Sequence, residues 1–389
     1  MNNRIFSSKL PTKRIIYSLV CVLFIFSCNI KNENTIEQKR WSKEKAWDWN
    51  NQYNWFVGTN FNPSTSINQL EFWQKESFDI ETIDKELRWS SELGMNLHRV
   101  YLHNLLWDQD SIGFIDRIEK YLATSNKYGI KTMFVLLDDV WHPIPKLGKQ
   151  EAAIPFVHNS RWVQAPGAEI LGDSTRHNEL KGYIKGIITH FANDKRVVCW
   201  DLYNEPDNVA WQKGLVELEL KNKHIYSFAL LKKTFQWARE VNPSQPLTAG
   251  LWKGKIETWG TPDKLRSLEK YMVMNSDIIS FHAYDSNMDS IRKKITELKK
   301  YGRPLICTEY MARSNNNTFE NVLPILKENK IAAINWGFVS GKTNTIYPWS
   351  SWVDNLTEEP EIWLHDILRQ DKTSFSEQEI EFIKELTNN

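Results

Sequence analysis

The chain has 389 residues, and its 49 Lys and Arg against 48 Asp and Glu give a formal net charge of +1. This balance argues against a nucleic-acid-binding protein, which carries a basic excess or a basic stripe. The 41% hydrophobic and 25% charged residues exclude a disordered chain. Aromatic residues make up 13% of the chain and include 18 tryptophans, which favours a site that stacks flat apolar faces such as those of sugar rings.

The N-terminal 27 residues have the pattern of an export signal. Four basic residues precede an apolar run over residues 15–26, which is too short to span a bilayer as a mature helix. The sequence Ile25-Phe26-Ser27-Cys28 resembles a bacterial lipobox, in which Cys28 is lipidated and becomes the first mature residue; an ordinary signal peptide cut elsewhere is the alternative. We therefore expect an exported lipoprotein anchored at the periplasmic or cell-surface face, with a signal peptide over residues 1–27, a polar tether and lead-in over residues 28–50 and one domain over residues 51–389.

Eight short runs rich in β-forming residues follow at intervals along the chain. Most are nearly continuous in apolar residues, which is typical of parallel strands buried on both faces. The eight runs cover residues 55–61, 96–102, 131–137, 197–203, 246–251, 277–283, 303–308 and 332–338.

Helical periodicity fills the intervals between these runs. Apolar residues recur at spacings of three and four before Gly94, Gly129 and Gly302, and each of these glycines leads into the next strand as a helix C-cap does. Eight strand–helix alternations in a chain of this length predict a (β/α)8 TIM barrel. A doubly wound open sheet is the alternative, but the sequence has no phosphate-type loop that would give such a sheet its function.

Two long connections and the C-terminal region complete the prediction. The connection after the third strand, residues 138–175, is far longer than such loops usually are, and another long aromatic loop follows the eighth strand over residues 341–354. Residues 360–368 are predicted to form the last barrel helix, and residues 376–386 an extra amphipathic C-terminal helix. Cys199 and Cys307 lie in apolar strands, where a free cysteine is the simpler interpretation, although export would permit a disulfide.

In a TIM barrel the functional residues follow the carboxyl ends of the strands. Polar and aromatic residues gather at these positions, which is the main functional signal in the sequence. They include Asn60, Arg99, His103, Asp138, Asp139, Trp141, Asn204, Glu205, Trp252, His282, Tyr284, Glu309 and Trp336.

Glu205 and Glu309 stand out because each ends an apolar strand. An ionised carboxylate is costly there unless it is paired, hydrogen-bonded or functional. Strands four and seven lie across the barrel from each other, so these two carboxylates can face each other over the mouth. Two facing carboxylates can hydrolyse a glycosidic bond, because one protonates the leaving oxygen while the other attacks the anomeric carbon or activates water.

The motifs Asn204-Glu205-Pro206 and Thr308-Glu309-Tyr310 resemble the signature of the retaining (β/α)8 glycoside hydrolases of clan A, and especially the cellulase and mannanase group called family 5. The resemblance runs from about residue 55 to residue 338 and includes the order of the strands. It implies that residues 51–389 form a catalytic domain in which Glu205 is the acid/base and Glu309 the nucleophile, with carboxyl groups about 5–5.5 Å apart.

The same resemblance implies roles for other residues at the barrel mouth. Asn204 is expected to bind the sugar 2-hydroxyl, Arg99 to support the nucleophile, and Tyr284 to donate a hydrogen bond to it. His282 belongs with Tyr284 to a His-x-Tyr pair, and Trp336 is expected to form the floor under the sugar. His103 and Trp141 are further candidates for substrate binding.

We therefore expect a glycosidase that acts on a β-linked mannan, xylan or β-glucan type of substrate and needs no metal or organic cofactor. Many cellulase-like proteins carry histidines after the third strand, where this chain has Asp138 and Asp139, so neither the sugar nor the choice between endo and exo action follows from the resemblance. Two alternatives are a non-catalytic surface glycan-binding protein on a degenerate barrel, and a metal-dependent hydrolase that uses Asp138, Asp139 and nearby histidines. The sequence does not indicate the oligomeric state.

Overall fold

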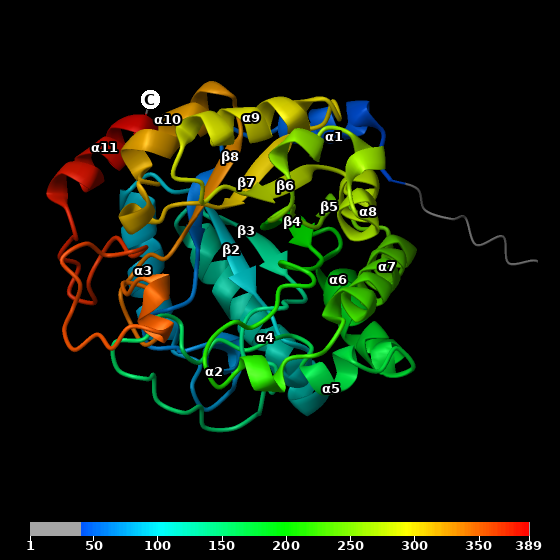
Figure 1. Cartoon of the computed structure of the whole chain (residues 1–389), viewed down its shortest axis with the longest axis horizontal. Helices are drawn as coiled ribbons and strands as arrows, with labels where there is room; N and C mark the ends of the chain where they lie inside the picture. The colour runs from blue at the N-terminus through cyan, green and yellow to red at the C-terminus, as the bar shows by residue number, and fades with distance from the viewer. Residues whose placement is uncertain (1–39, 389) are drawn as a thin grey trace, which may run out of the picture. The chain divides into compact units, whose positions relative to one another are not determined.

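The computed structural model describes residues 40–388 (Figure 1). All eight predicted strands are present, and each lies within its predicted run or extends one residue past it. They are β1 (Val57–Asn60), β2 (Leu97–Tyr101), β3 (Lys131–Val135), β4 (Val197–Asp201), β5 (Leu247–Thr248), β6 (Ile279–His282), β7 (Leu305–Glu309) and β8 (Ala332–Trp336).

The strands form one parallel sheet that closes into a barrel. Their order is β5-β4-β3-β2-β1-β8-β7-β6, and the first strand pairs with the last, with Gly58 opposite Ile334. The remaining seam, between β5 and β6, is closed by a parallel bridge between Leu251 and Phe281. The predicted TIM barrel is thus confirmed, and the open doubly wound sheet is wrong.

Helices surround the barrel, as Figure 1 shows. Gly94, Gly129 and Gly302 each have a positive φ, between 66° and 74°, as the predicted C-caps require. The helices are α1 (Lys43–Asn50), α2 (Gln69–Trp73), α3 (Ile80–Glu92), α4 (Asn104–Lys127), α5 (Ala168–Leu171), α6 (Lys181–Phe191), α7 (Lys223–Val241), α8 (Ser267–Asn275), α9 (Met288–Lys299), α10 (Phe319–Glu328) and α11 (Glu377–Asn388).

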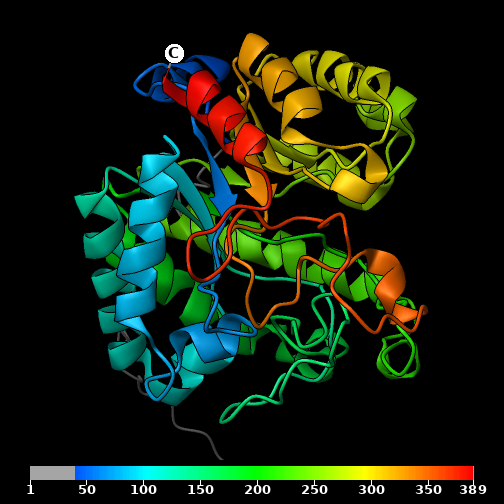
Figure 2. The same ribbon diagram turned by 90° about the vertical axis from the view of Figure 1, so that its left-hand side faces the viewer.

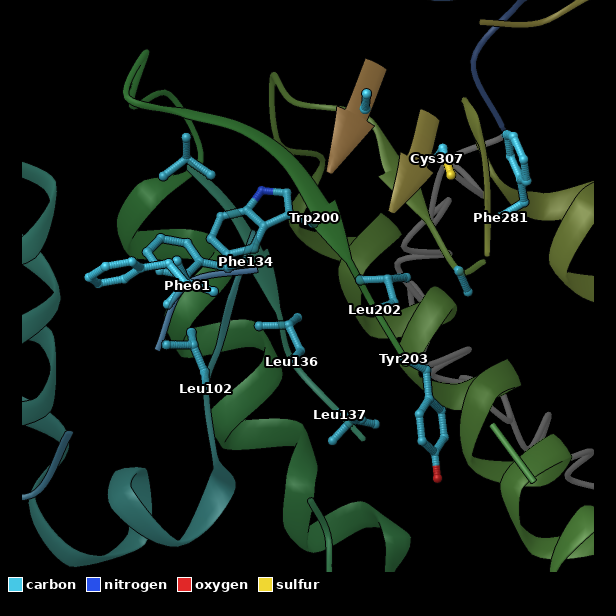
Figure 3. Close-up of a cluster of buried hydrophobic side chains, with 14 of the residues drawn as sticks. Phe61, Leu102, Phe134, Leu136, Leu137, Trp200, Leu202, Tyr203, Phe281 and Cys307 are labelled. Carbon is cyan, nitrogen blue, oxygen red and sulfur yellow. The ribbon is translucent and has the colours of Figure 1, made fainter. Parts of the chain in front are cut away.

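Alternating side chains divide the core into two layers. On β3, Phe134 packs outward in the large cluster between sheet and helices, and its ring lies 5.9 Å from that of Trp200 on β4 (Figure 3). Met133, by contrast, belongs to a separate cluster inside the barrel. Cys199 lies in the inner cluster and Cys307 in the outer one, and both are free thiols, so the simpler interpretation of these cysteines is confirmed.

The folded region begins earlier than residue 51. Arg40 and Trp41 dock on the segment that leads into β6: Trp41 N–H donates to Asp277 at 2.8 Å, and Arg40 donates to the carbonyl of Ser276 at 2.5 Å. Trp41, Ala46 and Trp49 are buried in the inner cluster. The polar tether predicted over residues 28–50 is therefore wrong for residues 40–50, because three apolar side chains of this charged segment insert into the base of the barrel.

The C-terminal region agrees with the prediction only in part. The extra C-terminal helix is present as α11, but residues 360–368 are not helical. Instead, the backbone N–H groups of Ile367 and Leu368 both donate to the carbonyl of Phe338, and Trp363, Leu364 and Ile367 are buried. These apolar residues form an irregular segment that is held beside the loop after β8.

The predicted export signal and Cys28 lie outside the described residues. Within residues 40–388, no helix is long and apolar enough to cross a membrane.

Long loops gather at the end of the barrel to which the strands point, which faces downward in Figure 2. The connection from β3 to α6 is as long as predicted and contains only the short α5 and one 3₁₀ turn. We call residues 136–167 the β3 loop and residues 337–352 the β8 loop. These two loops form much of the surroundings of the site.

Candidate active site

A pocket of about 160 Å³ opens at the mouth of the barrel. It is lined by the last residues of β7 and β8 and by residues of the loops and segments that follow the strands. The lining residues are Val140, Trp141, His158, Asn159, Trp162, Asn204, Glu205, Asn208, Trp252, Tyr284, Glu309, Trp336, Trp349 and His365. Six of the nine residues predicted for catalysis and sugar binding are among them.

Glu309, at the end of β7, is surrounded by hydrogen-bond donors. Arg99 Nη1 donates to its Oε1 at 2.9 Å, and the Tyr101 hydroxyl donates to the same oxygen at 3.0 Å. The Tyr284 hydroxyl donates to Oε2 at 3.0 Å, in the arrangement expected for it. These three contacts stabilise a negative charge on Glu309, as a carboxylate nucleophile requires.

Arg99 is completely buried and connects the two sides of the site. Besides Glu309, it donates to Asp201 Oδ2 at 2.8 Å and to Asn204 Oδ1 at 2.7 Å, and Asn60 also accepts a hydrogen bond from it. Alternation along β2 places Leu97, Arg99 and Tyr101 inside the barrel, so the interior changes from apolar at its base to charged just below the mouth. Because the buried guanidinium of Arg99 pairs with both Asp201 and Glu309, it fixes both carboxylates in position.

Glu205 has a different environment. Its backbone is in the left-handed region, with φ of 42°, where a non-glycine residue is strained, and such strain gathers at functional sites. Its side chain contacts Asn208 and lies 2.8 Å from His282 Nδ1. Burial raises the pKa of Glu205 to about 7, so much of this carboxyl group is protonated at neutral pH.

His282 lies between the two carboxyl groups. Its Nδ1 is 2.8 Å from Glu205 and 3.5 Å from Glu309. Burial lowers the pKa of His282 to about 4, so the imidazole is neutral near pH 7 and its contact with Glu205 is a hydrogen bond, not an ion pair. One oxygen of Glu205 and one of Glu309 lie within 4.8 Å of each other.

Aromatic side chains form the walls of the pocket. The Trp336 ring packs edge-on against Tyr101 and Trp162, with centroids 5.7 and 5.6 Å away. Trp141 lies against Trp211, which belongs to the loop after β4. Flat apolar faces exposed to a pocket that also holds polar groups suit a sugar ring, whose faces are apolar and whose rim is polar.

His103 does not reach the pocket, and its prediction as a substrate-binding residue is wrong. It is fully buried; its Nδ1 accepts from Leu105 N–H and its Nε2 lies 3.0 Å from the carbonyl of Gln164. The chain turns into α4 directly after β2, so His103 caps that helix and supports the β3 loop.

The two aspartates after β3 do not form a metal site with the neighbouring histidines. Asp138 accepts hydrogen bonds from Trp162 and Asn204, and Asp139 accepts them from Tyr203 and Ser227. Neither lines the pocket. The donors that enclose them connect the β3 loop with β4 and α7, which indicates a positioning role for both aspartates.

Several residues of the site were not predicted. Tyr101 lies two residues after Arg99 and therefore on the same side of β2, a signal that was present in the sequence. Asn208 follows Glu205 by three residues and caps its carboxyl group. His158 and His365 come from long irregular segments, and no periodic pattern placed them at the mouth.

One carboxylate at the mouth of this barrel is buried and accepts several hydrogen bonds, and the carboxyl group opposite it has a raised pKa. Such a pair in an aromatic pocket is typical of a glycoside hydrolase. The sequence profile described as Cellulase (glycosyl hydrolase family 5) matches residues 58–341. The chain belongs to glycosyl hydrolase family 5.

Solved structures share this fold at low sequence identity. The endo-1,4-β-D-mannanase of Thermotoga petrophila RKU-1 is 14% identical with a TM-score of 0.52, and the alignment covers 86% of this chain and 99% of the mannanase. The family 5 subfamily 18 protein of Streptomyces cattleya, solved with GlcNAc, is 10% identical with a TM-score of 0.54, over 86% of this chain and 79% of that one.

The exo-β-1,4-mannosidase Op5Man5 of an Opitutaceae bacterium, strain TAV5, is 13% identical with a TM-score of 0.55, over 86% of this chain and 59% of that one. No curated protein sequence shows a significant match to this chain.

Proposed function

We propose that this protein hydrolyses β-linked glycosides, with β-mannosides as the favoured class, by a retaining mechanism that needs only its own carboxyl groups. The observation that carries the proposal is the pairing of Glu309, held by three donors, with Glu205, whose pKa is raised to about 7, at a separation of less than 4.8 Å. Oxygen atoms this close favour a direct attack on the sugar over inversion, which needs the carboxyl groups far enough apart to hold a water between them. The mannan-type activities named for the structural neighbours support the choice of sugar.

In the proposed mechanism, each carboxyl group has one role in each of two steps. In the first step, a Glu309 oxygen bonds to the anomeric carbon, the bond from that carbon to the leaving oxygen breaks, and Glu205 gives its proton to that oxygen. In the second step, Glu205 takes a proton from water, whose oxygen replaces Glu309 on the anomeric carbon. Tyr284 and Arg99 hold Glu309 in line for both steps, and Asn204, fixed by Arg99 and Asp138, presents its amide to the sugar.

The proposed function is tested by sugar release from β-mannan, xylan, β-glucan and their oligosaccharides. We expect release from the mannan series above all. Release from xylan or β-glucan alone would contradict the choice of β-mannosides as substrate but would still support a glycoside hydrolase. Glycan binding without release from any substrate would contradict the function and favour a binding protein.

The raised pKa of Glu205 predicts an alkaline limit on activity. Glu205 must be protonated to act as the acid, so kcat/KM should fall as the pH rises through about 7. In Glu205→Gln this limb should disappear, and kcat/KM for substrates with poor leaving groups should drop by roughly 10²–10⁴-fold. Rates measured between pH 5 and 9 with an aryl glycoside and a disaccharide check this prediction. If the fall in kcat/KM above about pH 7 is unchanged in the variant, the group that titrates is not Glu205.

We also propose that the protein acts after export, anchored by a lipid on Cys28. The support is the run Ile25-Phe26-Ser27-Cys28 behind a basic, apolar leader. Radiolabelled fatty acid should enter the wild-type protein and not Cys28→Ala. Equal release of both proteins into the soluble fraction would contradict the anchor.

A further inference from the structure

The two long loops meet over one side of the barrel mouth. Asn159 N–H donates to the carbonyl of Thr343 at 2.8 Å, and Asn344 donates to the carbonyl of Ile154 at 3.1 Å. His158 N–H donates to the Ser351 hydroxyl at 2.9 Å. The β3 loop therefore reaches across the mouth to the β8 loop and is fixed to it by backbone contacts at several points.

This bridge is also packed. The ring of Phe156 meets that of Tyr347 at 5.8 Å, and both belong to a small apolar cluster with Ile346 and Trp363. On its other edge, the β3 loop is tied to α2, because Asn68 donates to the carbonyl of Arg161 at 2.8 Å. The bridge is thus a fixed wall with support on both sides.

The wall adjoins the Glu309 side of the site: the His365 ring lies 5.4 Å from that of His158 and 5.9 Å from that of Tyr284, which donates to Glu309. Glu205 marks where the leaving group sits, beside Asn208 and Trp252 of the loops after β4 and β5. In the proposed mechanism, the sugar whose bond is broken lies over Glu309 and against Trp336, in the pocket that Glu205 and the wall both line. Trp336 and Trp162 also line a second cavity of about 20 Å³, which has room for a water molecule and not for another sugar.

Two histidines line the pocket where the wall closes it. His158 Nδ1 lies 2.9 Å from the carbonyl of Tyr347, and His365 Nδ1 lies 2.6 Å from that of Met311. A carbonyl only accepts hydrogen bonds, so each Nδ1 carries the hydrogen. Burial lowers the pKa of His158 to about 4, and that of His365 also falls. Both rings are therefore neutral, and each leaves an unprotonated Nε2 as an acceptor.

We propose that the enzyme is exo-acting and releases single sugars from the non-reducing ends of β-linked oligosaccharides. The bridge between the two loops closes the pocket behind one sugar, and the Nε2 atoms of His158 and His365 accept hydrogen bonds from hydroxyl groups of that terminal residue. A long internal chain cannot run through the site. This inference rests on the proposed glycosidase function and specifies the substrate it takes.

The test uses the wild-type protein and β-1,4-linked mannopentaose with a fluorescent tag at its reducing end. Exo action predicts that the first tagged product is the tetrasaccharide, released together with monosaccharide. A pentasaccharide methylated on the 4-hydroxyl of its non-reducing end should react at least about tenfold more slowly, because the closed end has no space for the added group. Early tagged di- and trisaccharides, or equal cleavage of the methylated substrate, would overturn exo action while leaving the glycosidase function intact. No cleavage of any β-linked oligosaccharide would instead overturn the glycosidase function itself.

Two variants together separate sugar recognition from loop support. His158→Phe keeps an aromatic ring but removes both the Nε2 acceptor and the Nδ1 donor to Tyr347, so KM for the disaccharide should rise about tenfold or more with kcat changed less. Ser351→Ala removes only a loop contact, the acceptor of the His158 N–H, and should leave KM near the wild-type value. Lys149→Ala, an exposed position on the same β3 loop, should behave as wild type. A His158→Phe variant with unchanged KM would remove this histidine from sugar binding.

Discussion

Glu309→Gln should lose activity by roughly four orders of magnitude or more, the scale on which hydrolases lose rate when their nucleophile is removed. The amide has nearly the shape of the carboxylate but cannot form the glycosyl-enzyme bond. The amide also fits its surroundings poorly, because Arg99 and two tyrosine hydroxyls all donate hydrogen bonds to this side chain and the amide nitrogen cannot accept them. Steady-state rates on a mannoside, with thermal unfolding to verify the fold, measure the effect.

A matched control and a rescue sharpen this prediction. Glu381→Gln, on the exposed face of α11, should leave the rate unchanged. In Glu309→Gly, azide can enter from the vacated side and should restore turnover of an aryl β-glycoside with an α-glycosyl azide as the product. Residual activity above a tenth of wild type in Glu309→Gln would contradict the assignment of the nucleophile.

Arg99→Met should destabilise the fold by about 3–5 kcal/mol, the usual cost of removing one partner from a buried ion pair. The substitution leaves Asp201 and Glu309 buried without their shared positive charge, and it leaves Asn60 and Asn204 without a donor. The free energy of unfolding, measured in urea, gives the magnitude. Activity should fall as well, because Glu309 loses one of its three donors.

The control for this stability effect is Arg292→Met. Arg292 is more than half exposed, and its contact with Glu328 spans 3.7 Å, so its loss should change the free energy of unfolding by less than about 1 kcal/mol. Arg99→Lys should be intermediate, because a lysine restores the charge but not the planar fork of donors. An Arg99→Met protein as stable as the control would mean that Asp201 and Glu309 are accommodated without this charge.

The barrel was predictable because its signals are local and repeated. Each strand is a short apolar run, and Gly94, Gly129 and Gly302 mark where helices end. Residues 40–50 were misassigned because their three buried side chains are scattered among charged residues and find their contacts at the base of the barrel, more than 200 residues away in sequence. Residues 360–368 are apolar enough for a helix, but their end is bonded to the carbonyl of Phe338 through Ile367 and Leu368, and the segment is irregular.

The part of the site that lies at or near the strand ends was predictable from the sequence. Glu205, Glu309, Arg99 and Tyr284 sit at or next to strand ends, and the closure of the barrel brings them together. His103 shares that position but is turned inward as a helix cap. His158 and Asn159 were beyond prediction, because only the meeting of two long loops brings them to the pocket, and His365 comes from the irregular segment after those loops.

The most direct test of the double-displacement mechanism is the configuration of the first product. Proton NMR during the first minutes of hydrolysis of an aryl β-mannoside distinguishes the two anomers before they equilibrate. A product released as the β-anomer is the expected result, because Glu309 and then water each invert the anomeric carbon once. Initial release of the α-anomer would show a single displacement by water and contradict the roles of Glu309 as nucleophile and Glu205 as acid/base.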